Sequence, residues 1–158
     1  MRSASALVLT SRAGRIGHIS TEEIKKRAFI AEYRGPRLTN ELAEKLEARG
    51  NRYLYEINSR WTIDGSTRKN IARYANHSCR PNAESHQLNG KVILRAIKRI
   101  KPGDEITYDY GTDYYRNVIT PRGCKCVKCR EKRNKARRLQ RAARARRLRR
   151  AQRSSSLK

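Results

Sequence analysis

The chain has 158 residues, with 39 Lys and Arg against 14 Asp and Glu, and a formal net charge of +25. This length suits one ordinary domain with an appendage and excludes two separately cored domains. The charge is uneven, because residues 130–158 hold 14 basic residues and one acid, a net +13, which leaves +12 for residues 1–129. The chain is 37% hydrophobic, mostly before position 130, so we predict one compact domain and a cationic extension without a core.

The longest apolar stretch, Ala6–Leu9, is far shorter than the ~20 residues of a membrane span, and no apolar run of signal-peptide length follows the N-terminus. These features predict a soluble intracellular protein, in the cytoplasm, nucleoid or nucleus, with no membrane partner. The cysteines are Cys79, Cys124, Cys126 and Cys129. Inside a cell, clustered cysteines favour a metal site over disulfides, with redox chemistry as the alternative.

Short strand-like segments bounded by turn residues predict a mainly β core. In chain order, the predicted strands are residues 6–10, 29–33, 53–57, 61–63, 92–94 and 106–108.

The segments between these strands predict one helix and two turns. Residues 39–49 predict a short surface helix. Thr39 can cap its N-terminus, and Gly50 can end it. Leu42 and Leu46 share one face of this helix. Asn89-Gly90 predicts a type I′ hairpin turn, because both residue types tolerate positive φ. Pro102-Gly103 predicts another turn.

The C-terminal tail has a helix-forming composition in which Ala and Leu recur at every third residue from 136 to 151. At ~100° per residue, this spacing spirals around a helix and leaves arginine on all sides. Charge repulsion is expected to fray the segment in isolation, whereas a polyanion such as nucleic acid would neutralise it and induce helix. The alternatives are a solvated tail without a specific partner and a nuclear-import-like basic patch.

Three polar, aromatic-rich motifs occur where plain core strands would be apolar. They are Phe29-Ile-Ala-Glu-Tyr-Arg-Gly35, Arg73-Tyr-Ala-Asn-His-Ser-Cys79 and Gly103-Asp-Glu-Ile-Thr-Tyr-Asp-Tyr-Gly111. In this order, and with the cysteine cluster after them, they resemble the SET-domain protein lysine methyltransferases over about residues 5–130. The short chain looks like the compact microbial members of that family.

The resemblance implies a mainly β, β-clip-like SET fold of small curved sheets, in which the C-terminal segment is threaded beneath a preceding loop. It divides the chain into a SET domain at 1–111, a post-SET zinc-binding segment at 112–130, and a basic Arg/Ala-rich tail at 131–158.

The same resemblance implies S-adenosylmethionine-dependent mono- or dimethylation of a lysine on a basic or DNA-associated, histone-like protein. Methyl transfer from a sulfonium to an amine is an in-line displacement, so alignment supplies much of the rate. Tyrosines suit this work, because their hydroxyls orient the amine and their rings exclude water. By resemblance, Tyr110 is the catalytic tyrosine, Tyr33 and Tyr55 line the lysine channel, and Tyr108 favours monomethylation.

The cofactor pocket that the resemblance implies consists of Ile16, Gly17, Tyr53, Arg73, Tyr74, Asn76, His77 and Tyr114. Arg15 stands at the first glycine of the family's Gly-x-Gly turn, with Gly14 one position early, so we expect a distorted turn or an extra residue there. Arg27 and Lys69 also stand where family members often have glycine. Taken singly, Tyr33, Tyr53, Tyr55 and Tyr74 are more typical of half-buried strand aromatics.

For the cysteines, the resemblance implies one four-thiolate zinc site made by Cys79, Cys124, Cys126 and Cys129, with the post-SET segment closing over the active site. The competing interpretations are a Cys126–Cys129 redox pair and a Cys79 nucleophile beside His77.

Two other functions compete with the enzyme hypothesis. One is a catalytically weak SET-like zinc module that acts as a nucleic-acid-binding adaptor through its tail. The other is a simple redox or zinc-storage protein, which leaves the paired tyrosine motifs unexplained.

Overall fold

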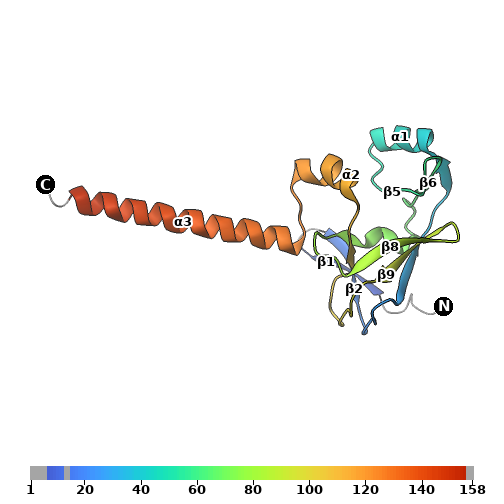
Figure 1. Ribbon diagram of the computed structural model, residues 1–158, viewed down its shortest axis with the longest axis horizontal. Helices are drawn as coiled ribbons and strands as arrows, with labels where there is room; N and C mark the ends of the chain where they lie inside the picture. The colour runs from blue at the N-terminus through green and yellow to red at the C-terminus, as the bar shows by residue number, and fades with distance from the viewer. Residues whose placement is uncertain (1–6, 13–14, 156–158) are drawn as a thin grey trace. The chain divides into compact units, whose positions relative to one another are not determined.

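The structure, a computed structural model, describes residues 7–12 and 15–155. The chain divides into two compact units, Met1–Tyr110 and Gly111–Lys158. The first contains four small β-sheets, and the described part of the second is helical (Figure 1). The prediction of a mainly β fold of small sheets is therefore confirmed.

Two three-stranded antiparallel sheets form most of the first unit. One has the order β3-β9-β8, built from Phe29–Tyr33, Lys91–Ala96 and Ala83–Leu88. The other has the order β4-β6-β5, built from Arg37–Thr39, Trp61–Asp64 and Leu54–Glu56. A two-residue turn joins β8 to β9, and φ is +49° at Asn89 and +72° at Gly90, which confirms the predicted hairpin.

Two further sheets have two strands each. β1 (Leu7–Arg12) and β2 (Arg15–Ser20) form an antiparallel hairpin, and β7 (Asn76–His77) pairs in parallel with β10 (Thr107–Tyr108). The parallel pair joins the second and third polar motifs. Gly14 and Ala6 lie outside the described residues, so the altered glycine turn stays a prediction.

The predicted surface helix is confirmed as α1 (Asn40–Ala48), which begins after Thr39, whose Oγ1 accepts a hydrogen bond from the Leu42 N–H over 3.4 Å. Its predicted apolar face is wrong in detail. Ala43 is the buried residue of the helix, whereas the Leu42 side chain is 45% exposed. The small Ala43 side chain lets the helix lie close to the sheet beneath it, and the bulkier leucine points outward.

A buried apolar cluster holds the sheets of the first unit together. The central strand β9 is buried at Val92, Ile93 and Leu94, and Ile30 of β3 is 1% exposed. A 3₁₀ turn, η2 (Ile71–Tyr74), leads into β7 beside this cluster. The core thus fixes the segments that carry the three polar motifs.

The second unit begins with three short helical segments: α2 (Thr112–Tyr114), a π-helical turn η3 (Tyr115–Ile119) and a 3₁₀ turn η4 (Thr120–Arg122). They are followed by α3 (Val127–Ser155), a continuous helix of 29 residues. The helix agrees with the helix-forming composition of this segment, and its fraying in isolation stays a prediction. Among the described helices, none combines the length and apolarity needed to cross a bilayer.

Four strands of the first unit escaped prediction, namely β2, β4, β7 and β8. Of the predicted strands, 29–33 matches β3 at both ends, and the others differ from the observed strands by a few residues.

Candidate active site

Four of the predicted site tyrosines lie on one buried core. Tyr33 and Tyr108 belong to the core cluster, with 5% and 7% of their surface exposed, and Tyr55 and Tyr110 pack against it. The ring centroids of Tyr33 and Tyr55 are 5.6 Å apart, and those of Tyr108 and Tyr110 are 4.7 Å apart. Tyr33 comes from the first polar motif, Tyr108 and Tyr110 come from the third, and Tyr55 lies in β5, so the fold brings these separate segments together.

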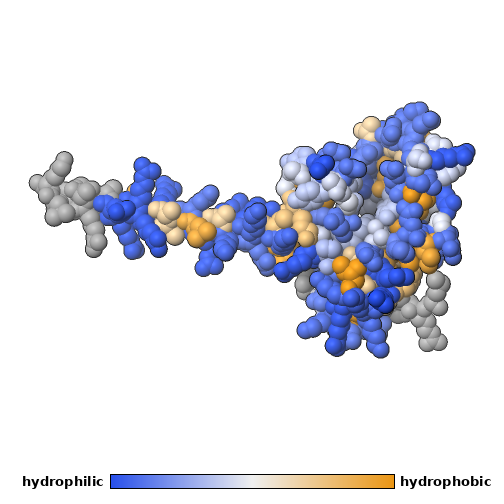
Figure 2. Space-filling model, in the orientation of Figure 1, coloured by the Kyte–Doolittle hydropathy of each residue, from blue (hydrophilic) through white to orange (hydrophobic). Residues whose placement is uncertain are grey.

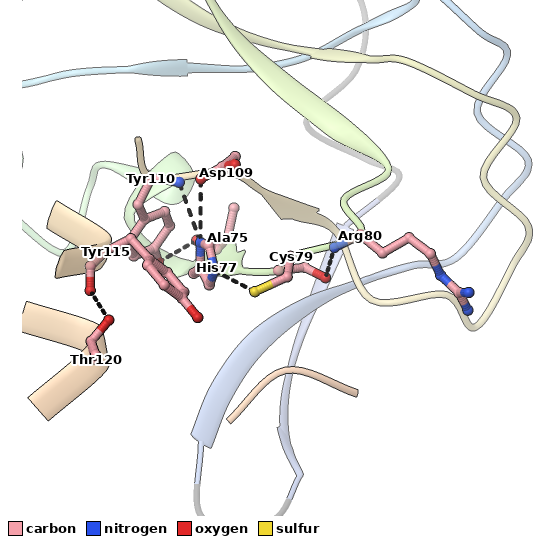
Figure 3. Close-up of polar contacts among 9 residues, drawn as sticks. Ala75, His77, Cys79, Arg80, Asp109, Tyr110, Tyr115 and Thr120 are labelled. Atoms are coloured by element: carbon pink, nitrogen blue, oxygen red, sulfur yellow. Dashed lines mark hydrogen bonds and ion pairs between the residues drawn. The ribbon is translucent and has the colours of Figure 1, made fainter. Parts of the chain in front are cut away.

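Tyr110 follows β10 and is held from two sides by the segment around β7 (Figure 3). Its hydroxyl donates a hydrogen bond to the Ala75 carbonyl over 2.8 Å, and its backbone N–H donates to Nδ1 of His77 over 3.3 Å. The His77 and Tyr110 rings meet edge to face at 5.5 Å. Parallel pairing of β7 and β10 places this aromatic pair at a strand end, where functional side chains are commonly found.

His77 is buried, and its ring also faces Asp109 and Cys79. Nδ1 lies 3.7 Å from a carboxylate oxygen of Asp109, and Nε2 lies 3.4 Å from Sγ of Cys79 (Figure 3). Because Nδ1 accepts from the Tyr110 N–H, the neutral ring carries its proton on Nε2 and donates toward the sulfur. This tautomer cannot deprotonate the Cys79 thiol, which argues against the nucleophilic pair.

The two channel tyrosines are anchored through their hydroxyls. Tyr33 donates to the Tyr53 carbonyl over 2.9 Å, and Tyr55 donates to Oγ of Ser85 over 2.9 Å. Gly65 leaves room for the Tyr33 ring, since a Cβ there would lie 2.4 Å from Cε1 of Tyr33. Rings fixed in this way can line a narrow water-poor channel.

Arg73 stacks on the predicted pocket aromatics. Its guanidinium carbon lies 3.8 Å from the Tyr53 ring centroid and 5.2 Å from that of Tyr74, and Nη1 donates to the Ser66 carbonyl. Its Nε is buried and has no hydrogen-bond partner among the described residues. This orphaned donor and the stacked rings are suited to a ligand with polar and aromatic parts.

The positive charge of the Arg73 guanidinium also affects the pKa of Asp64. Burial tends to raise the pKa of Asp64, but hydrogen bonds from Asn51 and Ser66 and the positive charge of Arg73 outweigh burial and lower that pKa. Asp64 is therefore ionised at neutral pH and balances the nearby positive charge.

Asn76 connects β7 to the hairpin that carries Ile16 and Gly17. Its Nδ2 donates to the Ile16 carbonyl over 3.0 Å and to Oε1 of Glu105 over 2.8 Å. A Cβ at Gly17 would lie 2.7 Å from that Nδ2 and 2.9 Å from that Oε1, so a larger residue here would displace the Asn76–Glu105 pair. Beside the pair, the Ile16 side chain is 57% exposed and Tyr53 is 37% exposed, which leaves apolar surface for a ligand.

Two residues of this region escaped sequence reasoning. Glu105 stands inside the third motif, next to Asp104, and its place in that motif was the available signal. His18 is 4% exposed, its Nε2 lies 2.7 Å from the Ile71 carbonyl, and its ring meets that of Tyr74 edge to face at 5.7 Å. Burial lowers the pKa of His18, and its Nδ1 has no hydrogen-bond partner within the described part of the chain.

The second unit carries the remaining predicted residues. Tyr114 lies half-buried in α2, and its predicted place near an adenine stays a prediction. The Sγ atoms of Cys124, Cys126 and Cys129 lie within 4.8 Å of one another, and Nη1 of Arg133 donates to the Cys124 carbonyl over 2.7 Å.

Each of Cys79, Cys124, Cys126 and Cys129 offers one Sγ that could ligate a metal ion. Four thiolates are the donor set that structural zinc prefers, so the residues fit this metal.

The comparisons with known proteins agree with the predicted family. The family model described as SET domain matches residues 15–111, more than half of the chain. Over 113 residues the chain is 34% identical to human histone-lysine N-methyltransferase 2D, and this match covers 66% of this chain and 2% of that protein. It is also 36% identical over 114 residues to histone-lysine N-methyltransferase ASHH3 of Arabidopsis thaliana, covering 66% of this chain and 31% of that protein.

A solved structure is similar as well. It is a humanized mutant of the Chaetomium thermophilum Polycomb Repressive Complex 2 bound to the inhibitor GSK126, with a TM-score of 0.59 and 26% identity over 67% of this chain and 15% of that chain. The chain thus spans less than a third of the length of each of these proteins. Because the SET-domain model matches most of the first unit, with its tyrosine core and the β7–β10 pair, the chain belongs to the SET-domain family.

Proposed function

We propose that this chain is an S-adenosylmethionine-dependent protein-lysine N-methyltransferase that mono- or dimethylates a lysine on a basic, histone-like protein. Family membership and the activities for which the relatives are named support this proposal. The observation that carries it is the position of Tyr110, fixed by Ala75 and His77 and 4.7 Å from the Tyr108 ring.

In the proposed reaction, the tyrosines position and shield the substrate amine. Tyr33 and Tyr55 line its approach, and Tyr110, whose oxygen is fixed by Ala75, orients its N–H groups. A lysine amine must lose its proton before it can attack. A nearby positive charge lowers the amine pKa, so the site needs no dedicated general base.

S-adenosylmethionine would supply the electrophilic methyl group. The residues proposed to hold it are those around the β1–β2 hairpin and η2: Ile16, Gly17, Tyr53, Arg73, Tyr74, Asn76 and His77, with Tyr114 from the second unit. The apolar surfaces of Ile16 and Tyr53 and the orphaned Nε of Arg73 support this assignment.

Zinc is the second proposed cofactor, held by Cys79 with Cys124, Cys126 and Cys129. The donor set supports it, because the chain offers four cysteine Sγ atoms and a tetrahedral zinc site takes four ligands. Metal binding would then order the segment that leads into α3.

The proposed partners are a protein that presents the lysine and nucleic acid bound by α3, which implies a role at chromatin or a nucleoid. The α3 sequence has 14 Lys and Arg against Glu131, and this charge is the observation that keeps the adaptor function as a second candidate.

A methyl-transfer assay tests the proposal. The full-length chain, loaded with zinc, is incubated with labelled S-adenosylmethionine and a panel of basic proteins that includes histones. Tyr110→Phe is expected to abolish transfer to lysine, and Lys45→Gln on the exposed face of α1 is the matched control that keeps it. If the folded, zinc-loaded parent transfers no methyl group to any protein of the panel, the result contradicts the proposed enzyme activity and favours the adaptor function.

A further inference from the structure

The first unit has a concentration of positive charge away from the tyrosine core. It lies where the turn at residues 25–28 runs beside residues 96–101. The Arg27 N–H donates to the Ala96 carbonyl over 2.7 Å, and Ile24 exchanges two backbone hydrogen bonds of 2.9 Å with Ile100. We call the exposed cations of these two segments, apart from Arg99, which pairs with Glu23, the basic edge; they are Lys25, Lys26, Arg27, Lys98 and Lys101.

The basic edge keeps an excess of positive charge, because residues 22–28 and 96–104 hold six Lys and Arg against three acidic residues, a net charge of +3. In the described residues, Arg99 pairs with Glu23, whereas the five cations of the basic edge have no ion-pair or hydrogen-bond partner for their charged groups. Figure 1 shows the two loops at the lower edge of the first unit, and Figure 2 shows hydrophilic side chains over that edge. Gathering like charges on hydrogen-bonded segments costs folding energy, which an external anion would recover.

Arg27 adds a second, independent observation. The Ala28 N–H donates to the Lys25 carbonyl over 3.1 Å, so Lys25–Ala28 is a tight turn, and Arg27 has φ +70° at its third position. Glycine is the residue favoured there, because a side chain is strained at positive φ. Glycine would satisfy the turn better, yet the chain carries a cation at this point. Strained residues of this kind occur where a side chain has a role beyond the fold.

From these observations we infer that the basic edge binds the phosphate backbone of double-stranded DNA. Lys and Arg on a rigid surface contact phosphates without reading sequence. The exposed large apolar side chains of the described chain include none from the two segments, which disfavours an anionic membrane. The two segments also lack the exposed aromatic rings on which single-stranded nucleic acids stack.

The basic edge and α3 then form two cationic elements on one chain. Binding of either element to a duplex raises the local concentration of the other near the same duplex. Loss of the basic edge therefore weakens DNA binding even when α3 is intact. This inference concerns binding alone and does not depend on methyl transfer.

The test measures affinity of the full-length chain for a labelled 30-base-pair duplex of arbitrary sequence over a series of salt concentrations. In the Lys25→Gln/Lys98→Gln/Lys101→Gln variant, we expect the negative slope of log K against log[salt] to become less steep by roughly 2 to 3, because each lost phosphate contact removes about 0.9 from its magnitude. Lys45→Gln, an exposed lysine on α1, is the matched control and should change the slope by less than about 1.

Arg27 provides a variant that separates binding from folding. Arg27→Gly and Arg27→Asn both tolerate the left-handed backbone, so the melting temperature should stay the same or rise while DNA binding weakens. A salt slope unchanged in both the triple variant and the Arg27 variants overturns the inference. A second result would also overturn the inference: a triple variant that binds the duplex as tightly as the parent but has lost affinity for poly-glutamate. The basic edge would then bind an acidic protein and not DNA.

Discussion

The Tyr110 hydroxyl donates a hydrogen bond of 2.8 Å to the carbonyl of Ala75, a residue 35 positions earlier. Ala75 directly precedes β7, and Tyr110 lies just after β10, so this bond continues the parallel pairing of the two strands. The Tyr108 ring is buried beside the Tyr110 ring, and the two ring centroids are 4.7 Å apart.

Tyr108→Phe should shift the product from monomethyl-lysine toward di- and trimethyl-lysine. Removing one hydroxyl leaves more space for a methylated amine and takes away a hydrogen-bond partner that holds the amine in one orientation. Mass spectrometry of the methylated protein measures the product distribution. An unchanged distribution in an active variant would contradict the proposed role of Tyr108.

Gly35→Ala should destabilise the fold by about 3 kcal/mol or more. A Cβ at Gly35 would lie 1.8 Å from the backbone carbonyl oxygen of Asp64, and a backbone atom at the end of β6 cannot move aside cheaply. Chemical denaturation measures the loss. Gly103→Ala is the control, because its Cβ meets nothing within 4 Å and its φ of +85° costs only about 1 kcal/mol. Equal losses in the two variants would show that the strand does give way.

Stability should fall as the pH drops below the ordinary His pKa of 6.5. Burial lowers the pKa of His18 in the folded chain, so between that lowered pKa and 6.5 the unfolded chain binds more protons than the folded one. The stabilisation is complete above pH 6.5 and is lost progressively as pH falls toward the folded pKa. In His18→Gln the side-chain amide can still donate to the Ile71 carbonyl. Between pH 7.5 and 5, the midpoint of urea unfolding should fall less in this variant than in the parent. A variant with the parent's pH dependence would exclude His18 as the cause.

Purified protein should contain one zinc ion per chain, and Cys126→Ser should reduce both zinc content and thermal stability. A tetrahedral site that loses one of four thiolates binds zinc far more weakly, and metal binding is coupled to folding. Elemental analysis and thiol counting with and without a chelator measure the two effects. Full thiol reactivity in the untreated parent would contradict the metal site.

Local signals in the sequence were sufficient for part of the fold. Phe29–Tyr33 is a strand because its apolar and β-branched or aromatic residues suit a buried sheet, and Asn89-Gly90 makes its turn through backbone preference alone. β8 lacked such a signal. Ser85, His86 and Gln87 are polar, and this segment is a strand because it pairs with the apolar β9.

The same distinction applies to the candidate site. The family motifs identified the tyrosines of the site, because these motifs are recognised from the types of their residues and the order in which they occur. The partners that fix them were not readable, since Ala75 contributes a backbone carbonyl and Glu105 acts through Asn76. Such contacts depend on the pairing of distant segments, for which a single sequence has no local pattern.

The parallel pair β7–β10 also sets the order in which the protein acquires its site. During synthesis, every residue of the proposed pocket in the first unit has been made by the time His77 is translated. Tyr108, Tyr110 and the strand that pairs with β7 follow some thirty residues later. Long-range strand pairing forms slowly and only when both partners are present. A nascent chain that stops before residue 107 therefore carries an open strand at Asn76–His77, and the site is the last part of this unit to mature.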